Sequence, residues 1–221
     1  MGAIGEAGSR SSEIRKNIEL SVKQQHTTTT HNVDRKALES VQNFLIVAQI
    51  PPVTIERVIH EAALAIYRTF SFKEVAIGLK SETDGRYRYE EFLGLSKPAE
   101  QALRKLSYSL EEFYSLSDYP SIWLSEFTEL CIVEENPLLD FEKDTYDKET
   151  FLSRPRKSPD EFLEGDYLDI SMYNEQDELI GWIELSKPIF SKMPSIQTIN
   201  RIEVFASVLS ILIQKTLLTR K

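Results

Sequence analysis

The chain has 221 residues, 41% of them hydrophobic, and a formal net charge of −9 at pH 7. This length fits one domain with a tail, and the hydrophobic fraction suffices for a substantial core. An acidic chain lacks the basic face that broad binding to nucleic acid or anionic membranes requires, so we expect neither partner. We also see no apolar run near the roughly 20 residues that span a bilayer and no secretory leader, which predicts a cytoplasmic protein. The single cysteine, Cys131, excludes an internal disulfide and a cysteine-built zinc site.

Residues 1–33 are predicted to be a mobile polar tail. Three of the eight glycines fall within the first eight residues, and four consecutive threonines follow later. Between them, Ile14, Ile18 and Val22 recur every four residues, a spacing that allows a short helix. Isolated helices of that length are marginal in water. The organised domain is therefore predicted to span residues 34–221.

Two amphipathic helices open this domain. Asp34 is a good N-cap for the first helix, Pro51-Pro52 ends it, and Thr54 can cap the second. Apolar residues recur at helical spacing in both segments: Leu38, Val41, Leu45 and Ala48, then Ile55, Val58, Ile59, Ala62, Ala65 and Ile66.

The pattern then changes to a period of two, which is typical of strands. Residues 74–80 and 86–93 are predicted to pair as antiparallel strands around the turn at Asp84-Gly85. Short helices are expected over residues 103–113, where Leu103, Leu106, Leu110 and Phe113 would cover one face of the sheet. Residues 130–133 are predicted to form another short apolar strand.

Residues 134–163 are predicted to be a long acidic and aromatic loop. A loop of this length inside a compact domain is usually functional or disordered. Its spaced aromatic residues predict that it packs on another element: Phe141, Tyr146, Phe151 and Phe162. It does not match a calcium-binding loop, because Thr145 stands at the glycine position and Phe151 replaces the bidentate glutamate.

Two β-rich runs then flank a polar tip at residues 174–177, which predicts an antiparallel hairpin. A four-residue tip pairs Tyr173 with Glu178 and sets the register of the rest. One face is then apolar, with Met172 opposite Leu179, Ile170 opposite Gly181 and Leu168 opposite Ile183. The other face is amphipathic and carries Tyr167, Asp169, Ser171 and Tyr173 opposite Glu184, Trp182, Ile180 and Glu178.

A final helix is expected from about Ser195, with an apolar stripe wider than one sheet face needs. The order of elements predicts an α+β domain with a central antiparallel sheet of about five to six strands. The N- and C-terminal helices would pack on one face of the sheet. The short helices and the long loop would cover the other.

Three segments carry a resemblance to a known family. They are the early strand Val75-Ala76-Ile77-Gly78-Leu79, the late strand Leu179-Ile180-Gly181-Trp182-Ile183-Glu184-Leu185 and the last helix around Phe205-Ala206-Ser207-Val208-Leu209. Over roughly residues 36–216 the chain resembles a GAF domain. The resemblance implies a sensory module that often dimerises through its terminal helices and holds a small molecule on the amphipathic sheet face. The implied ligand-binding residues are Tyr167, Asp169, Ser171, Tyr173 and Trp182.

The chain departs from the ligand signatures of that family. The Asn-Lys-Phe-Asp-Glu set of cyclic-nucleotide-binding members is missing, and Ile132 follows Cys131 where bilin-attaching members have histidine. Methionine-sulfoxide-reducing members use several cysteines, whereas the single thiol of this chain cannot form and resolve a disulfide within the chain. No cofactor can therefore be named.

Several residues have a functional and a structural interpretation. Asp169 opposite Trp182 resembles a pocket wall more than a solvated sheet face, and a desolvated Asp169 would need a cation or donor from the ligand. Glu164 and Asp166 crowd near Asp169 as acids do in metal or acid/base sites, but solvated surface acids are the preferred interpretation. Cys131 reads as a small core residue. His60 reads as a surface or packing residue rather than a haem ligand.

Three functions remain open at this stage. The first is a non-catalytic sensory or regulatory module that binds a small ligand and signals through its terminal helices to a partner protein. It would act as a homodimer with a seam formed by Leu38, Val41 and Leu45 with Ile202, Leu209 and Ile213. The alternative is an interaction or dimerisation module of the same fold with a filled pocket. An enzyme ranks third, because the common catalytic motifs do not occur in the sequence.

Overall fold

The computed structural model describes residues 12–21, 30–115, 118–136, 139–140, 144–145 and 154–218. Its centre is a six-stranded sheet of order β2-β1-β6-β5-β4-β3, with every neighbouring pair antiparallel. The strands are β1 (Phe72–Lys80), β2 (Tyr87–Leu93), β3 (Ile122–Trp123), β4 (Thr128–Cys131), β5 (Tyr167–Tyr173) and β6 (Leu179–Pro188). The predicted α+β class with an antiparallel sheet is confirmed.

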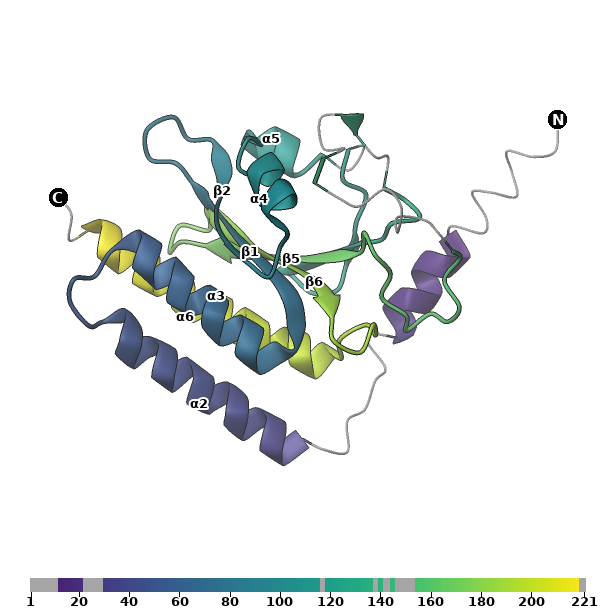
Figure 1. Ribbon diagram of the computed structural model, residues 1–221, viewed down its shortest axis with the longest axis horizontal. Coiled ribbons are helices and arrows are strands. Elements are labelled where there is room, and N and C mark those ends of the chain that lie inside the picture. The colour runs from purple at the N-terminus through teal and green to yellow at the C-terminus, as the bar shows by residue number, and fades with distance from the viewer. Residues whose placement is uncertain are drawn as a thin grey trace.

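Helices lie on both faces of this sheet (Figure 1). Three long ones lie on one side: α3 (Ile55–Phe70) and α6 (Ile196–Leu218) pack against the sheet, and α2 (Thr30–Ala48) packs on these two helices. The short helices α4 (Lys97–Leu103) and α5 (Leu110–Phe113) lie on the other face. The Thr54 side chain caps α3 by accepting from Arg57 N, and Ser195 Oγ accepts from Thr198 N at the start of α6.

The main core fills the space between the sheet and the long helices. Phe44 of α2 stacks on Phe205 of α6 with ring centroids 4.8 Å apart. Ile66 of α3 and Ile77 of β1 are fully buried in the same cluster. The burial of this apolar surface is the dominant favourable term in folding, so this layer is the stable base of the domain.

Helix α6 is long and apolar enough to cross a bilayer by length and composition, although we saw no such run in the sequence. Core helices can pass the same test. Ile202, Phe205 and Leu209 are fully buried against the sheet and the other helices. Packing within the chain therefore accounts for much of its apolar surface.

The burial of these α6 residues corrects the predicted dimer seam. Ile202, Leu209 and Ile213 are at most 3% exposed, so they cannot face a second subunit. Leu38 on α2 is 63% exposed and remains accessible. The seam as specified is wrong, and dimerisation itself stays a prediction.

Residues 12–21 fall inside the segment expected to be a mobile tail, yet they form a helix. Ile18 is fully buried and joins the main core. Arg15 donates to Glu135 Oε2 over 2.9 Å and to the carbonyl of Ser121. Helix α2 also begins at Thr30, four residues before the predicted cap at Asp34. For residues 12–21, tertiary contacts supply the stability that a short isolated helix lacks.

The hairpin register differs from the prediction by two residues. Ile170 pairs with Ile183, Leu168 with Leu185, and Asp169 with Glu184 instead of Trp182. A slip of two keeps every side chain of the regular region on its predicted face, because the side-chain period of a strand is two. The apolar face and the amphipathic face therefore survive the error.

An irregularity near the tip explains the slip. The register shifts between Met172, which pairs with Gly181, and Tyr173, which pairs with Leu179, so Ile180 is the extra residue. As a result Leu179 joins the aromatic cluster on the second face, and Ile180 packs against the main core. The sequence pattern predicts the opposite faces for these two residues.

Candidate functional site

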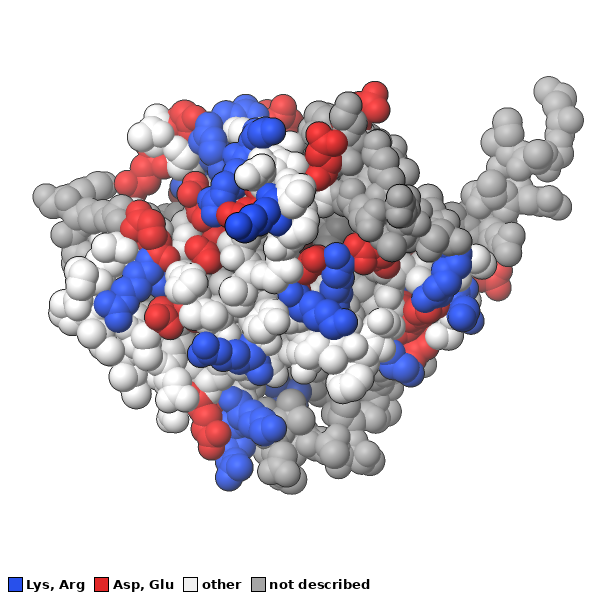
Figure 2. Space-filling model, viewed as in Figure 1, with Lys and Arg blue, Asp and Glu red and all other residues white. Residues whose placement is uncertain are grey.

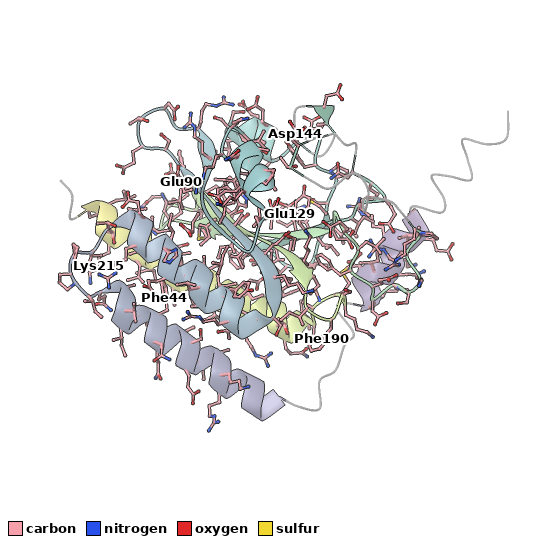
Figure 3. The ribbon with its side chains drawn as sticks, in the orientation of Figure 1. Phe44, Glu90, Glu129, Asp144, Phe190 and Lys215 are labelled. Carbon is pink, nitrogen blue, oxygen red and sulfur yellow. The ribbon has the colours of Figure 1, made fainter. Side chains whose placement is uncertain are left out.

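A cavity of about 490 Å³ lies on the second face of the sheet, opposite the long helices. Residues of β1, β2, β4, β5 and β6 form its floor, and the α4–α5 region and part of the 134–166 connection form its walls. In Figure 3, Glu129 lies on the side of the sheet that faces α4 and α5, whereas Phe44 lies among the long helices on the other side. The site and the main core thus occupy opposite faces of the same strands.

Aromatic rings form one side of this cavity. Trp182 is only 1% exposed, and the rings of Tyr89 and Phe113 lie 4.8 and 5.1 Å from it. Gly78 on β1 makes this packing fit, because a Cβ there would come within 2.1 Å of the Trp182 ring. Tyr108 completes the group in an edge arrangement 6.4 Å from Trp182.

A row of three carboxyl groups crosses the cavity floor. Strand pairing places Glu129 of β4 opposite Asp169 of β5, and Asp169 opposite Glu184 of β6. Directly opposed side chains have Cβ atoms about 5 Å apart, so these three acids are close neighbours. Ser121 donates to Glu129, and the Tyr89 hydroxyl donates to Glu184.

Asp169 at the centre of the row is the least satisfied of the three. Its Oδ1 is buried and accepts no hydrogen bond from the residues that the structure describes. Burial, followed by repulsion from Glu184 and Glu129, raises the pKa of Asp169 well above its usual value. Burial likewise raises the pKa of Glu129. The surroundings therefore favour a protonated, uncharged Asp169.

The structure separates the five predicted ligand-binding residues into two groups. Tyr167, Asp169 and Trp182 line the cavity. Ser171 is buried and lies outside the lining, with its N–H bonded to the carbonyl of Phe127. Tyr173 also lies outside it, and its hydroxyl is 2.9 Å from that of Tyr114. Whether any of the five binds a ligand remains a prediction.

Sequence reasoning did not select Tyr89, Glu129 and Glu184 as site residues. Glu184 is predicted on the right face, and the alternating tyrosines of β2 were a usable signal for Tyr89. Glu129 carried no such signal, because it is 40 positions from Asp169 in the sequence and only the strand order brings the two together.

A buried ion-pair network borders the cavity at the start of β5. Arg156 donates to Glu134 over 2.7 and 2.9 Å and to both oxygens of Asp166 over 2.9 Å. The Asp166 side chain is fully buried and that of Arg156 is 5% exposed. Asp166 also accepts from the N–H groups of Val133 and Leu163. The preferred interpretation of Asp166 as a solvated surface acid is therefore wrong.

Burial raises the pKa of Asp166 although Arg156 opposes that effect. Burial also disfavours the charge on Arg156, but its bonds to Glu134 and Asp166 outweigh this and raise its pKa. We take the pair as ionised, because four donors converge on the two Asp166 oxygens. This network fixes residues 154–163 against the sheet.

Lys187 is the one basic residue among the described residues that line the cavity. It is bound by Glu74 over 2.7 Å and by Glu164 over 2.9 Å, so its charge is already matched. Among the residues that the structure describes, no group of three or more is placed to hold a metal ion.

Other candidates have structural surroundings. Cys131 is buried at the cavity floor, and burial raises the pKa of its thiol well above the usual value. The exposed His60 has its Nδ1 3.0 Å from Glu91 Oε1. Phe162 of the long loop is buried, while Phe141, Tyr146 and Phe151 lie outside the described residues. On the face shown in Figure 2, basic and acidic side chains are interspersed.

No protein-family profile matches this sequence, and no curated protein matches it either. Solved structures do match. The GAF domain of a phosphoenolpyruvate-protein phosphotransferase from Coxiella burnetii aligns with 84% of this chain and 96% of its own, at 12% identity and a TM-score of 0.54. A GAF domain/HD domain protein from Geobacter sulfurreducens aligns with 77% of this chain and 99% of its own, at 11% identity and a TM-score of 0.55.

The chromophore-binding domain of a bacteriophytochrome from R. palustris aligns with 89% of this chain and 65% of its own, at 12% identity and a TM-score of 0.55. Identities this low establish the fold alone. The chain has the fold of GAF domains, as the strand and helix motifs predicted.

Proposed function

We propose that this protein is a non-catalytic, cytoplasmic sensory module that binds a small ligand in the cavity on the sheet face. The observation that carries the proposal is Asp169, which lines a cavity of about 490 Å³ and whose buried Oδ1 accepts no hydrogen bond from the described residues. Ligand sites are typically concave, largely apolar and aromatic, with a few polar groups that fix orientation. A bound donor would remove the cost of leaving this oxygen unsatisfied.

The structural neighbours support this use of the fold. One neighbour is the chromophore-binding domain of a bacteriophytochrome. Another is a domain of a putative two-component sensor histidine kinase from Sinorhizobium meliloti, aligned at a TM-score of 0.50. By analogy with these proteins, a ligand-dependent change would be read by a partner protein or a further domain.

A direct connection exists between the cavity and the terminal helices. The Thr128 hydroxyl donates to Glu203 of α6 over 2.6 Å, and Ser125 donates to the same oxygen. Thr128 precedes Glu129 on β4, so the strand that holds one cavity carboxyl is tied to α6. Strand β5 also spans both sides of the sheet, because Asp169 lines the cavity and the next residue, Ile170, belongs to the main core. Movement of β4 or β5 on ligand binding would reach α6 by these contacts.

Native mass spectrometry of the freshly purified protein tests the binding step. We expect a bound small molecule that is lost on denaturation, or a mass shift with a compound from a panel of cations, neutral molecules and anions. A chain that arrives bare and binds no member of the panel would contradict the proposal.

Hydrogen exchange tests the transmission step. Ligand should change protection in α6 as well as at the cavity, and Glu203→Gln should reduce the change in α6 while affinity is retained. Glu175→Gln on the exposed hairpin tip is the matched control. An α6 response that is identical in Glu203→Gln and in the wild type would exclude this route.

An interaction module is the second candidate, and exposed apolar residues on α2 and at its end favour it. Leu38, Ile46 and Ile50 are 63%, 65% and 48% exposed. Such residues fit a homodimer contact through the first long helix. Light scattering should give a dimer mass that falls to the monomer in Leu38→Glu/Ile46→Glu. A monomeric mass for the wild type at micromolar concentration would exclude this dimer.

A further inference from the structure

The charge balance of the cavity limits which ligand it can take. Seven of the described residues that line it are acidic: Glu74, Glu129, Asp144, Glu164, Asp166, Asp169 and Glu184. Lys187 is matched by Glu74 and Glu164, and Arg156 matches Asp166. Among the described basic residues, none forms an ion pair with Glu129 or Asp169. An anionic ligand would meet repulsion at this end of the cavity.

Asp169 differs from its neighbours because its Oδ1 can accept a hydrogen bond that no described residue donates. Ser121 satisfies Glu129 and Tyr89 satisfies Glu184, while Asp169 Oδ1 is buried without a donor among the described residues. The largest effects on its carboxyl are burial and two neighbouring acids, all of which disfavour its charge. A ligand with a positively charged hydrogen-bond donor would both supply the missing hydrogen bond and offset the repulsion from the two neighbouring acids.

The aromatic side of the cavity suits the same ligand. Tyr89, Tyr108, Phe113 and Trp182 all line it, with ring centroids 4.8 to 6.4 Å from the Trp182 ring. Aromatic faces attract organic cations and also pack against carbon chains. A fully hydrated inorganic cation would gain little from such a wall. The carboxyl row and the rings together select an organic molecule with a cationic group.

We propose that the cavity binds a small organic amine, with its ammonium group hydrogen-bonded to Asp169 within the Glu129–Asp169–Glu184 row and its carbon skeleton against Trp182 and Tyr89. This inference rests on the proposed function and gives the chemical class of its ligand. At a pH below its raised pKa, Asp169 loses its proton to solvent on binding, and the ammonium N–H groups donate to the carboxylate. One proton is released, and no covalent bond forms.

This exchange makes the affinity depend on pH. The titratable groups that face Asp169 are Glu129 and Cys131 on β4, Tyr167 on β5, Glu184 on β6 and Tyr89 on β2. Because Asp169 must ionise to hold the ammonium group, affinity for an amine rises with pH until the free carboxyl is ionised without help. A neutral ligand of the same shape shows no such rise from Asp169.

Isothermal titration calorimetry with matched probes tests the assignment. The amines are phenethylamine and butane-1,4-diamine, the neutral counterparts are 2-phenylethanol and butane-1,4-diol, and the anion is 3-phenylpropionate. We expect an amine to bind at least about tenfold more tightly than its neutral counterpart, with 3-phenylpropionate weaker still. Titration in two buffers of different ionisation enthalpy should show proton release for the amine.

Variants locate the contact. Asp169→Asn keeps the shape of the side chain and should weaken amine binding about tenfold or more while leaving the neutral probe unchanged. Glu129→Gln should weaken the amine less, and Glu175→Gln on the exposed tip should have no effect. A thermal melt of each variant confirms that it is folded.

The outcomes separate the two proposals. Equal binding of amine and neutral probes, tighter binding of the anion, or an Asp169→Asn protein with full amine affinity would overturn the amine assignment and leave the sensory function standing. If no amine binds at millimolar concentration but another class does, the assignment is likewise wrong. Failure of every class would overturn both.

Discussion

Asp166 and Asp169 are three residues apart in the chain, and each has a buried carboxyl oxygen, but their surroundings differ. Each carboxylate oxygen of Asp166 accepts two hydrogen bonds, and Arg156 supplies a counter-charge. Asp169 lies between two other acids, and its Oδ1 accepts nothing from the described residues. Native proteins satisfy nearly all buried polar atoms, so an exception calls for an explanation. We take the first acid as part of the architecture and the second as part of a binding site.

Removing the cation from the satisfied network should produce the largest effect. Arg156→Met leaves Asp166 buried without its counter-charge, and we expect a loss of about 3–5 kcal/mol in the free energy of unfolding, measured by urea denaturation. Arg154→Met is the matched control, because Arg154 pairs with Glu161 at the exposed surface and its loss should change stability little. A small loss in Arg156→Met would show that the network does not support the fold.

Substituting each acid by its amide compares the two regions directly. Asp166→Asn replaces one acceptor oxygen with an NH2 group that faces Arg156 and either Val133 N or Leu163 N, and should cost about 2–3 kcal/mol. Asp169→Asn removes an unpaired acid from between two others, so we expect a ligand-free protein that is unchanged or up to about 1 kcal/mol more stable. Urea denaturation of both variants measures the difference. Equal destabilisation by the two substitutions would remove the distinction between the sites.

The pH dependence of stability offers a smaller effect with a definite sign. Asp169 has a raised native pKa, so the native state binds more protons than the unfolded state above the ordinary value of 3.8. The contribution of Asp169 to stability is therefore complete below 3.8 and is lost as pH rises toward its native pKa, by about 1.4 kcal/mol for each pH unit that separates its native and unfolded pKa values. The measurement is the difference in the free energy of unfolding between wild type and Asp169→Asn across this pH range. The difference is needed because Glu129, whose pKa is also raised, changes the stability with the same sign in both proteins. A pH-independent difference would mean that Asp169 has its ordinary pKa.

The sequence predicted the layers and the faces of this fold better than its register. The alternation of the second hairpin placed Asp169 and Trp182 on the face opposite the core, and it survived a two-residue slip because the strand period is two. The irregularity at Ile180 could not be foreseen, since both Leu179 and Ile180 are apolar and either can face the core. Ile18 has the right spacing for a helix, but the printed contacts of that helix, from Arg15 to Ser121 and Glu135, are with residues far along the chain.

The site was harder to predict because it depends on long-range pairing. Asp169 was selected for its neighbourhood with Trp182, yet the residue opposite it is Glu184. The repulsion that defines its chemistry comes from acids on β4 and β6, and local pattern says nothing about the order of those strands. The local pattern therefore predicted that Asp169 and Trp182 share a face, whereas only the strand order shows that Glu129 and Glu184 flank Asp169.

A carbon-13 NMR titration of the Asp169 carboxyl, assigned with Asp169→Asn, tests the central claim most directly. In the ligand-free protein the account predicts a pKa above the ordinary value of 3.8, and a fall in that pKa when phenethylamine binds. An ordinary or lowered pKa in the free protein would mean that Asp169 already has a partner. That result would contradict its assignment as the unsatisfied group of a ligand site.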